Sequence, residues 1–203
     1  DILAAGGGIL STMRATREAS VEQLAKAAAA RLDTMLALGT TTVEIKTGYG
    51  LSRDAEINAL RAIDELHTTY DCEVVPTFLG AHAVPPEFKG DAEGYTRHVI
   101  DDMLPAVKAW YDASPFAGSD APFSADVFCE RNAFNLDQSR RILTAAKDMG
   151  LAVRAHVDEF TDLGGVKMAV ELGALSVDHL DVTGADGIAA LAACSDDGTT
   201  STS

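Results

Sequence analysis

Residues 151–180, LAVRAHVDEFTDLGGVKMAVELGALSVDHL, decide the fold that we expect for this chain. An alternating run of β-forming residues carries His156, and Glu159 follows three residues later. A short amphipathic segment and a glycine-containing turn lead to a second strand, which carries Asp178 and His179. Two neighbouring strand ends thus present imidazoles and carboxylates to one place, which indicates a metal-assisted or acid/base hydrolytic site on an α/β scaffold.

The same alternation of strands and helices extends along the rest of the chain. Helical patterns are expected from Ser20 to Gly39, after Ser52, near 95–110 and at 136–149, 163–172 and 185–193. Strands are expected at 40–45, 73–79 and 123–129 and in the runs that end at His156 and His179. Three consecutive glycines at 6–8 make residues 4–17 an expected loop, which matches no phosphate-binding motif. This cadence is typical of a parallel α/β sheet.

Polar residues at the strand ends favour a barrel over a doubly wound sheet. Lys46, His82, Glu130, His156 and His179 all stand at or just after the carboxyl end of a predicted strand. In an open doubly wound sheet the chemistry collects at one switch point, whereas in a (β/α)8 barrel nearly every strand can supply a residue. We therefore predict about strands two to six of a TIM barrel, with the remaining strands outside this chain.

Composition narrows the class of protein. The 203 residues carry 31 acidic and 16 basic side chains, a net charge of −15, which argues against nucleic acid or an anionic membrane as partner and favours a small-molecule substrate. The three cysteines have no paired spacing, so a reducing cytoplasm is expected rather than a disulfide framework. No membrane span or signal peptide is predicted. We expect one domain over 1–193 and a disordered polar tail over 194–203, both ends having the character of a fragment.

Each candidate residue also has a purely structural interpretation. His156 could be a hydrogen-bonded core histidine, and His179 could be the partner of the aspartate before it. His82 could belong to a loop that only local bonds order, and Tyr49 could be a turn aromatic between two glycines. Glu130 could cap the helix that follows it.

Six motifs together resemble one known family. GGGILSTMRATREAS, TTVEIKTGYGL, TFLGAHAVP, DVFCE, AHVDEF and SVDHL occur in the order found in imidazolonepropionases, the third enzyme of histidine degradation, within the amidohydrolase superfamily. The resemblance runs from residue 1 to about residue 193. It implies a metal-dependent hydrolase that opens the ring of 4-imidazolone-5-propanoate with water, giving N-formimino-L-glutamate, and that uses one Zn²⁺ or Fe ion.

The resemblance also implies roles for single residues. His156 matches a metal-ligand histidine at the end of the fifth barrel strand. Glu159 matches the acid that contacts the substrate ring and handles the proton of the attacking water, and His179 matches the histidine that orients this water and acts as acid/base. Tyr49 and His82 match substrate-binding positions. Such roles agree with the need of a cyclic amide for activated water and a proton carrier.

Two of the family's metal-ligand motifs are absent from this sequence, the HxH of the first strand and the aspartate of the eighth. Catalytic zinc takes about three protein ligands, so we expect the isolated chain to bind metal weakly and to lack turnover, whereas a longer parent, which could be a homodimer, would be active. Arg14 and Arg17 are candidates to bind the substrate carboxylate. The alternatives are an amidohydrolase for another cyclic amide or an imine, a non-catalytic α/β binding module, and a structural half that needs a complementary chain.

Overall fold

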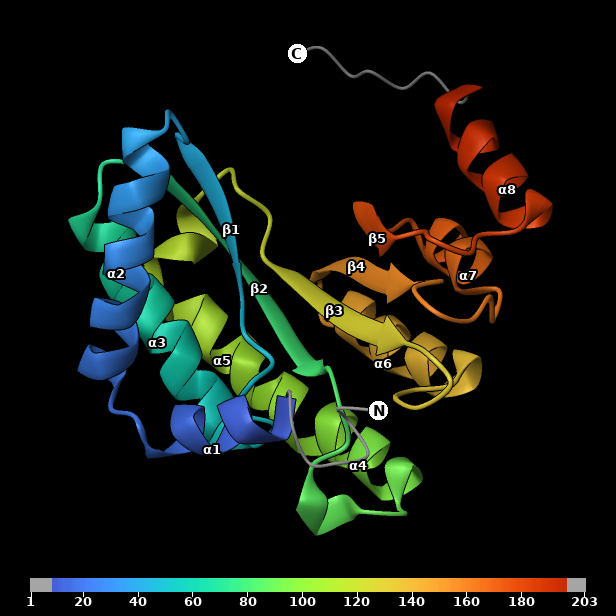
Figure 1. Cartoon of the computed structure of the whole chain (residues 1–203), viewed down its shortest axis with the longest axis horizontal. Coiled ribbons are helices and arrows are strands. Elements are labelled where there is room, and N and C mark those ends of the chain that lie inside the picture. The colour runs from blue at the N-terminus through green and yellow to red at the C-terminus, as the bar shows by residue number, and fades with distance from the viewer. Residues whose placement is uncertain (1–8, 197–203) are drawn as a thin grey trace.

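The computed structural model describes residues 9–196 as a single curled sheet of five parallel strands with helices on its outer side (Figure 1). The strands are β1 (Thr42–Lys46), β2 (Glu73–Ala81), β3 (Ser124–Cys129), β4 (Ala152–Val157) and β5 (Ser176–His179). Their order in the sheet is their order in the chain. A doubly wound sheet would reverse its order at a switch point, so that alternative is wrong and the prediction of a partial (β/α)8 barrel is confirmed.

Helices connect the strands and cover the convex face of the sheet (Figure 1). None of the helices that the structure describes has both the length and the hydrophobicity needed to cross a membrane. A five-residue π-helical segment, η2, joins α4 to α5, and η1 and η3 are short 3₁₀ turns. The bounds are α1 (Ile9–Glu18), α2 (Val21–Ala37), α3 (Arg53–Thr69), η1 (Pro86–Phe88), α4 (Ala92–His98), η2 (Val99–Met103), α5 (Leu104–Ala113), η3 (Pro115–Gly118), α6 (Leu136–Asp148), α7 (Gly165–Leu172) and α8 (Ala185–Asp196).

Local sequence signals set most helix ends as expected. Ser20 and Asn135 each form a capping box with the glutamine three residues later, in which both side chains accept backbone N–H groups. Two differences stand out. Residues 9–18 form helix α1, where we expected a loop, because Met13 is buried against the core. Helix α8 runs past Ala193 to Asp196, and the glycines at 6–8 and the rest of the expected tail, 197–203, lie outside the described residues.

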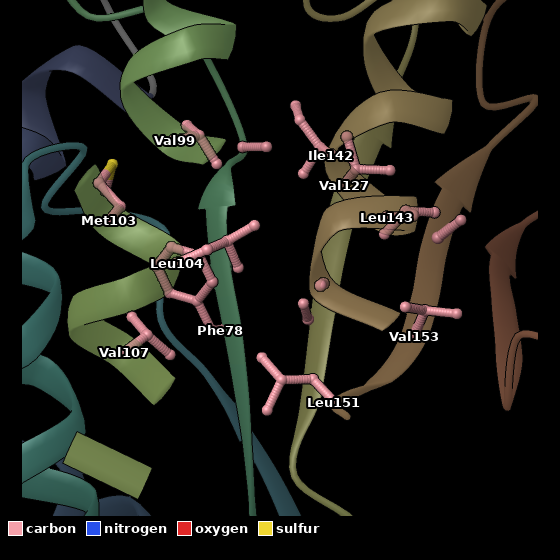
Figure 2. Close-up of a cluster of buried hydrophobic side chains, with 14 of the residues drawn as sticks. Phe78, Val99, Met103, Leu104, Val107, Val127, Ile142, Leu143, Leu151 and Val153 are labelled. Carbon is pink, nitrogen blue, oxygen red and sulfur yellow. The ribbon is translucent and has the colours of Figure 1, made fainter. Parts of the chain in front are cut away.

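Outward-facing side chains of the strands form the apolar core with the helices. Phe78 of β2 packs beside Val99, Met103, Leu104 and Val107 of η2 and α5 in the close-up (Figure 2). A second group joins β3 and β4 to α6, and its labelled members are Val127, Ile142, Leu143, Leu151 and Val153 (Figure 2). All are almost fully buried, and each such side chain stabilises the fold by about 2 kcal/mol. These two groups fix the carboxyl ends of β2, β3 and β4 relative to one another.

The concave face of the sheet is polar, which is unusual for parallel strands covered on one side by helices. Many of the alternate residues that face this side are charged or hydroxylated, whereas the residues between them face the core. Hydrogen bonds across the strands join these inward groups, for example from Thr77 Oγ1 to Glu44 Oε1 (2.5 Å) and from Arg154 Nη1 to Ser176 Oγ (2.6 Å). The inward polar set consists of Glu44, Lys46, Thr77, Ser124, Asp126, Arg154, His156, Ser176 and Asp178.

Candidate active site

A cavity of about 460 Å³ lies at the carboxyl ends of the strands and collects the residues that the sequence singled out. Tyr49, His82, His156, Glu159 and His179 all line it. Parallel strands end at the same rim, so residues far apart in the chain become neighbours there. The other lining residues are Ile9, Lys46, Thr47, Leu79, Phe128 and Phe160.

His156 is held by a buried carboxylate from the neighbouring strand. Its Nδ1 lies 3.1 Å from Asp126 Oδ1 and 3.0 Å from Oδ2, and the Asp126 side chain has no exposed surface. Burial by itself would lower the pKa of His156, but the hydrogen bond and negative charge of Asp126 outweigh burial and raise it. The same contact, against the opposing effect of burial, lowers the pKa of Asp126. Since Nδ1 is engaged, Nε2 is the ring nitrogen available to other ligands.

Lys46 connects three carboxylates on the concave face. Its Nζ lies 2.9 Å from Glu44 Oε1, 3.0 Å from Asp126 Oδ2 and 3.3 Å from Asp178 Oδ2. Burial opposes the charge on Lys46, yet the charge of Asp126 and the hydrogen bond to Glu44 raise its pKa, so the ammonium is fully formed. Glu44 Oε1 also contacts a second cation, Arg154, whose Nε lies 3.1 Å away. The inner face of the sheet therefore carries one continuous ionic network.

Metal-ligand chemistry is present within this network. Asp126, His156 and Asp178 each offer a ligand atom, and these atoms all lie within 4.8 Å of one another. A carboxylate that fixes one nitrogen of a histidine and leaves the other open is the usual partner of a metal-binding imidazole. The residues present thus fit one ligand of a metal ion, His156 Nε2, with Asp126 as the group that orients it.

His179 and Glu159 stand together beside His156. His179 Nε2 lies 3.5 Å from Glu159 Oε2, and the His179 and His156 rings have their centres 5.4 Å apart. Phe128 lies beside all three imidazoles of the site, with its ring centre 6.2 to 6.4 Å from those of His82, His156 and His179. The backbone of His179 has φ of 77°, a conformation that L-residues rarely adopt and that recurs at functional sites. A proton donor or acceptor pair therefore faces the same space as His156.

Tyr49 and His82 form another part of the cavity wall. Their rings meet edge to face with centres 5.1 Å apart, and His82 Nδ1 lies 2.9 Å from the carbonyl oxygen of Gly48. A register irregularity in β2 between Phe78 and Ala81 precedes His82. Burial lowers the pKa of His82, so its imidazole is neutral at pH 7. A neutral imidazole and a phenol at this wall are suited to hydrogen-bond a polar, uncharged ring.

The turn that carries Tyr49 is held by Glu56 of α3. Glu56 is fully buried, and its carboxylate accepts hydrogen bonds from the backbone N–H groups of Gly48, Gly50 and Leu51 at 2.7 to 2.8 Å. Arg17 of α1 binds the same turn through the carbonyl oxygens of Gly50 (2.6 Å) and Leu51 (3.0 Å) and pairs with a glutamate of η1. Arg17 is thus used in holding the turn. It does not line the cavity, and neither does Arg14, in the part of the chain that the structure describes.

Glu130 does not line the cavity but binds the loop that carries Glu159. Its carboxylate accepts the N–H groups of Phe160 and Thr161, both at 3.0 Å, and of Arg131 at 2.8 Å. These bonds outweigh the effect of burial and lower the pKa of Glu130. The alternative that Glu130 caps the next helix is wrong, because Asn135 caps it. Glu130 instead fixes the loop that presents Glu159.

Sequence reasoning missed Asp126, Glu44 and Glu56. The first two stand at alternate positions of their strands, in phase with His156 and Lys46, and that alternation is the signal that would have placed them on the concave face. Glu56 lies in a helical segment and gives no such signal. Asp178 was recognised only as a neighbour of His179, whereas its carboxylate points to Lys46 and lies 3.7 Å from His156 Nε2.

Comparison with known proteins supports the resemblance of the motifs. No protein-family model matches the chain. The chain is 58% identical over 195 residues to the imidazolonepropionase of Chloroflexus aggregans, which is 96% of this chain and 46% of that protein. It is 50% identical over 192 residues to that of Herpetosiphon aurantiacus (95% and 44%) and 49% identical over 183 residues to that of Alkaliphilus metalliredigens (90% and 41%). The resemblance is confirmed along nearly the whole chain, which spans about half the length of the curated relatives it matches.

Proposed function

We propose that this chain, a homologue of imidazolonepropionases, carries the central part of an enzyme that hydrolyses 4-imidazolone-5-propanoate to N-formimino-L-glutamate. One observation carries the proposal: Tyr49, His82, His156, Glu159 and His179, which are spread over four βα units, line a single cavity. The substrate class is supported by the names of the relatives and by the neutral His82 and Tyr49 in the cavity wall.

The reaction adds water across the amide C–N bond of the ring. A C–O bond forms at the ring carbonyl carbon, the C–N bond breaks, and one proton moves from the water to the departing nitrogen. Glu159 accepts the proton of the attacking water and returns it to that nitrogen. His179, 3.5 Å from Glu159, orients the water and stabilises the oxyanion of the tetrahedral intermediate. Tyr49 and His82 hold the ring from their part of the cavity wall.

His156 would hold the metal ion that such hydrolases use, Zn²⁺ or Fe, through Nε2. When bound, the ion supplies Lewis acidity that lowers the pKa of its water towards ~7 and polarises the amide carbonyl. Asp126 contributes by fixing the ring orientation and tautomer of His156. A single histidine does not complete a catalytic site, so we propose that the other ligands come from residues outside 9–196 and that the isolated chain is inactive.

We propose that the protein is a metabolic enzyme of the cytoplasm that acts on a small molecule, a location favoured by three cysteines without paired spacing. The net charge of −15 argues against nucleic acid or an anionic membrane as partner. A homodimer of the full-length enzyme is part of the proposal only by analogy with the family.

A chimaera tests the proposal most directly. The 195-residue matching segment of the Chloroflexus aggregans enzyme would be replaced by this chain, and ring opening of imidazolone propionate would be measured. We expect turnover, an at least about hundredfold loss in Glu159→Gln with metal retained, and loss of the metal itself in His156→Ala. Glu18→Gln, an exposed glutamate on α1, is the matched control and should behave like the parent.

Two outcomes would contradict the proposal. An inactive but folded and metal-loaded chimaera would show that these residues do not support the reaction. Preferential turnover of hydantoins or of formimino compounds would favour the alternative of an amidohydrolase for another cyclic amide or an imine.

A further inference from the structure

Lys46 stands in an arrangement that usually surrounds a metal ion. Its ammonium contacts carboxylate oxygens of Glu44, Asp126 and Asp178 within 3.3 Å, and only 23% of its side chain is exposed. Two of these acids, with His156, also form the group whose ligand atoms lie within 4.8 Å of one another. The ammonium of Lys46 therefore contacts two of the carboxylates that a divalent cation would use.

The carboxylates around the Lys46 ammonium need a positive charge at that position. Glu44 is held independently by Thr77 and Arg154, and Asp126 is held by its bond to His156, so these carboxylates stay in place whatever lies between them. With His156 neutral, as a metal ligand must be, three carboxylates face two permanent cations, Lys46 and Arg154. Loss of Lys46 would leave partly buried negative charges uncompensated, which is strongly unfavourable.

We infer that Lys46 is a built-in counter-ion that takes the place of a second metal ion and keeps Asp126 and Asp178 out of metal coordination. The inference rests on the proposed function, because it assigns the ammonium a task in a metal site. Asp126, engaged by Lys46 and His156, is left to orient the imidazole. His156 then presents Nε2 to the cavity for one ion only. Lys46 is a positioning residue in this account, since it acts through Asp126 and His156.

Binding of Mn²⁺ by the 203-residue chain and its Lys46→Met variant tests this inference. Mn²⁺ suits carboxylate and imidazole ligands and has little affinity for the three cysteines, and its free form is counted by electron paramagnetic resonance. Methionine keeps an unbranched side chain as far as Cε and lacks the charged Nζ. We expect Lys46→Met to bind one Mn²⁺ per chain about a hundredfold more tightly than the parent chain does. Adding Asp178→Asn to this variant should abolish the gain.

Two controls separate charge from general disturbance. Lys46→Arg keeps a cation and should gain no Mn²⁺ site. Lys108→Met breaks a lysine–aspartate pair of comparable length on the outer surface of α5, where Lys108 Nζ lies 2.6 Å from Asp112, and should bind Mn²⁺ like the parent chain.

Every outcome bears on the inference. Equal Mn²⁺ affinity in Lys46→Met and the parent chain, or a gain that survives Asp178→Asn, would overturn it. If Lys46→Met folds only when Mn²⁺ is present, the ion has replaced the ammonium and the inference stands. If Mn²⁺ fails to restore the fold of Lys46→Met and of Lys46→Gln, the inference is wrong. None of these readouts measures ring opening, so an inactive chimaera would refute the proposed reaction and leave this result unchanged.

Discussion

In each of two loops at the rim of the cavity, a glutamate carboxylate accepts backbone N–H groups, but the two glutamates come from different parts of the fold. The turn after β1 carries Tyr49 and is bound by Glu56, which belongs to the helix that directly follows it. The loop after β4 carries Glu159 and is bound by Glu130, the residue that directly follows the neighbouring strand β3. The first loop is buried around its glutamate, whereas Phe160 in the second is 69% exposed. The carboxylate that binds the first loop therefore comes from the same βα unit, with Arg17 of α1 adding two bonds, whereas the carboxylate that binds the second loop comes from the neighbouring unit.

Removal of Glu56 should have the largest effect of the changes that probe this difference. Glu56→Ala leaves three N–H groups of a buried turn without acceptors, each of which costs about 1 to 3 kcal/mol unless water reaches it. We expect the free energy of unfolding in urea to fall by about 3 to 5 kcal/mol. Glu65→Ala, an exposed position on the same helix, is the matched control. A loss below about 1 kcal/mol would show that the turn does not need its carboxylate.

Replacing one glycine in each loop by alanine should give effects on stability of intermediate size. Gly48 has φ of 104°, and a Cβ there would lie 2.6 Å from the carbonyl oxygen of Leu79, whereas Gly164 has φ of 78° and its Cβ would meet only a side-chain atom at 3.8 Å. Gly48→Ala combines backbone strain with a clash and should destabilise by about 2 to 3 kcal/mol. Gly164→Ala carries the strain alone, about 1 kcal/mol. Thermal unfolding of both variants measures the difference in stability between them. Equal losses of stability would show that the clash at Gly48 contributes nothing.

Replacement of Glu130 should give the smallest loss and a distinctive dependence on pH. Glu130→Gln weakens bonds to an exposed loop that water can rehydrate, so we expect a loss of about 1 kcal/mol at pH 7. The folded-state pKa of Glu130 lies below the ordinary value of 4.5, so its contribution is complete above that pH and disappears as the pH falls through the lowered pKa. The difference between parent and variant in urea unfolding should therefore close in acid.

Glu171→Gln serves as the control for that titration. Glu171 pairs with Arg140 on the surface of α7, where both side chains are more than 40% exposed, and such pairs contribute little to stability. A Glu130→Gln difference that stays constant from pH 7 to about pH 4 and below would mean that the ionised carboxylate is not what binds the loop.

The fold could be predicted from the sequence because the local signals for helices, strands and turns agree with one another. Capping boxes at Ser20 and Asn135, glycines after the helices and β-branched runs each mark an element, and the elements follow in a regular cadence. Helix α1 is the exception. The three glycines that precede it in the sequence signal a loop, whereas Met13 within it is buried against the core, a tertiary contact that local patterns do not contain.

The sequence predicted the cavity residues that stand at the ends of strands, and it missed the supporting residues that lie within strands or helices. Tyr49, His82, His156, Glu159 and His179 stand at or just after strand ends and were predicted, and all five line the cavity. Asp126 stands inside a strand that reads as a buried apolar run, so its role emerges only from the pairing of β3 with β4. The functions of Glu56 and Glu130 depend on which N–H groups fold back onto them, and no spacing in the sequence encodes that.

The agreement between sheet order and chain order has a consequence for biosynthesis. Each strand pairs with the one made just before it, through a connection one helix or a few short helices long. A nascent chain can therefore add each βα unit to a finished edge as it leaves the ribosome, without waiting for a distant segment. Translation speed, and pauses between units, should then influence the yield of native protein far less than in folds whose neighbouring strands are made far apart.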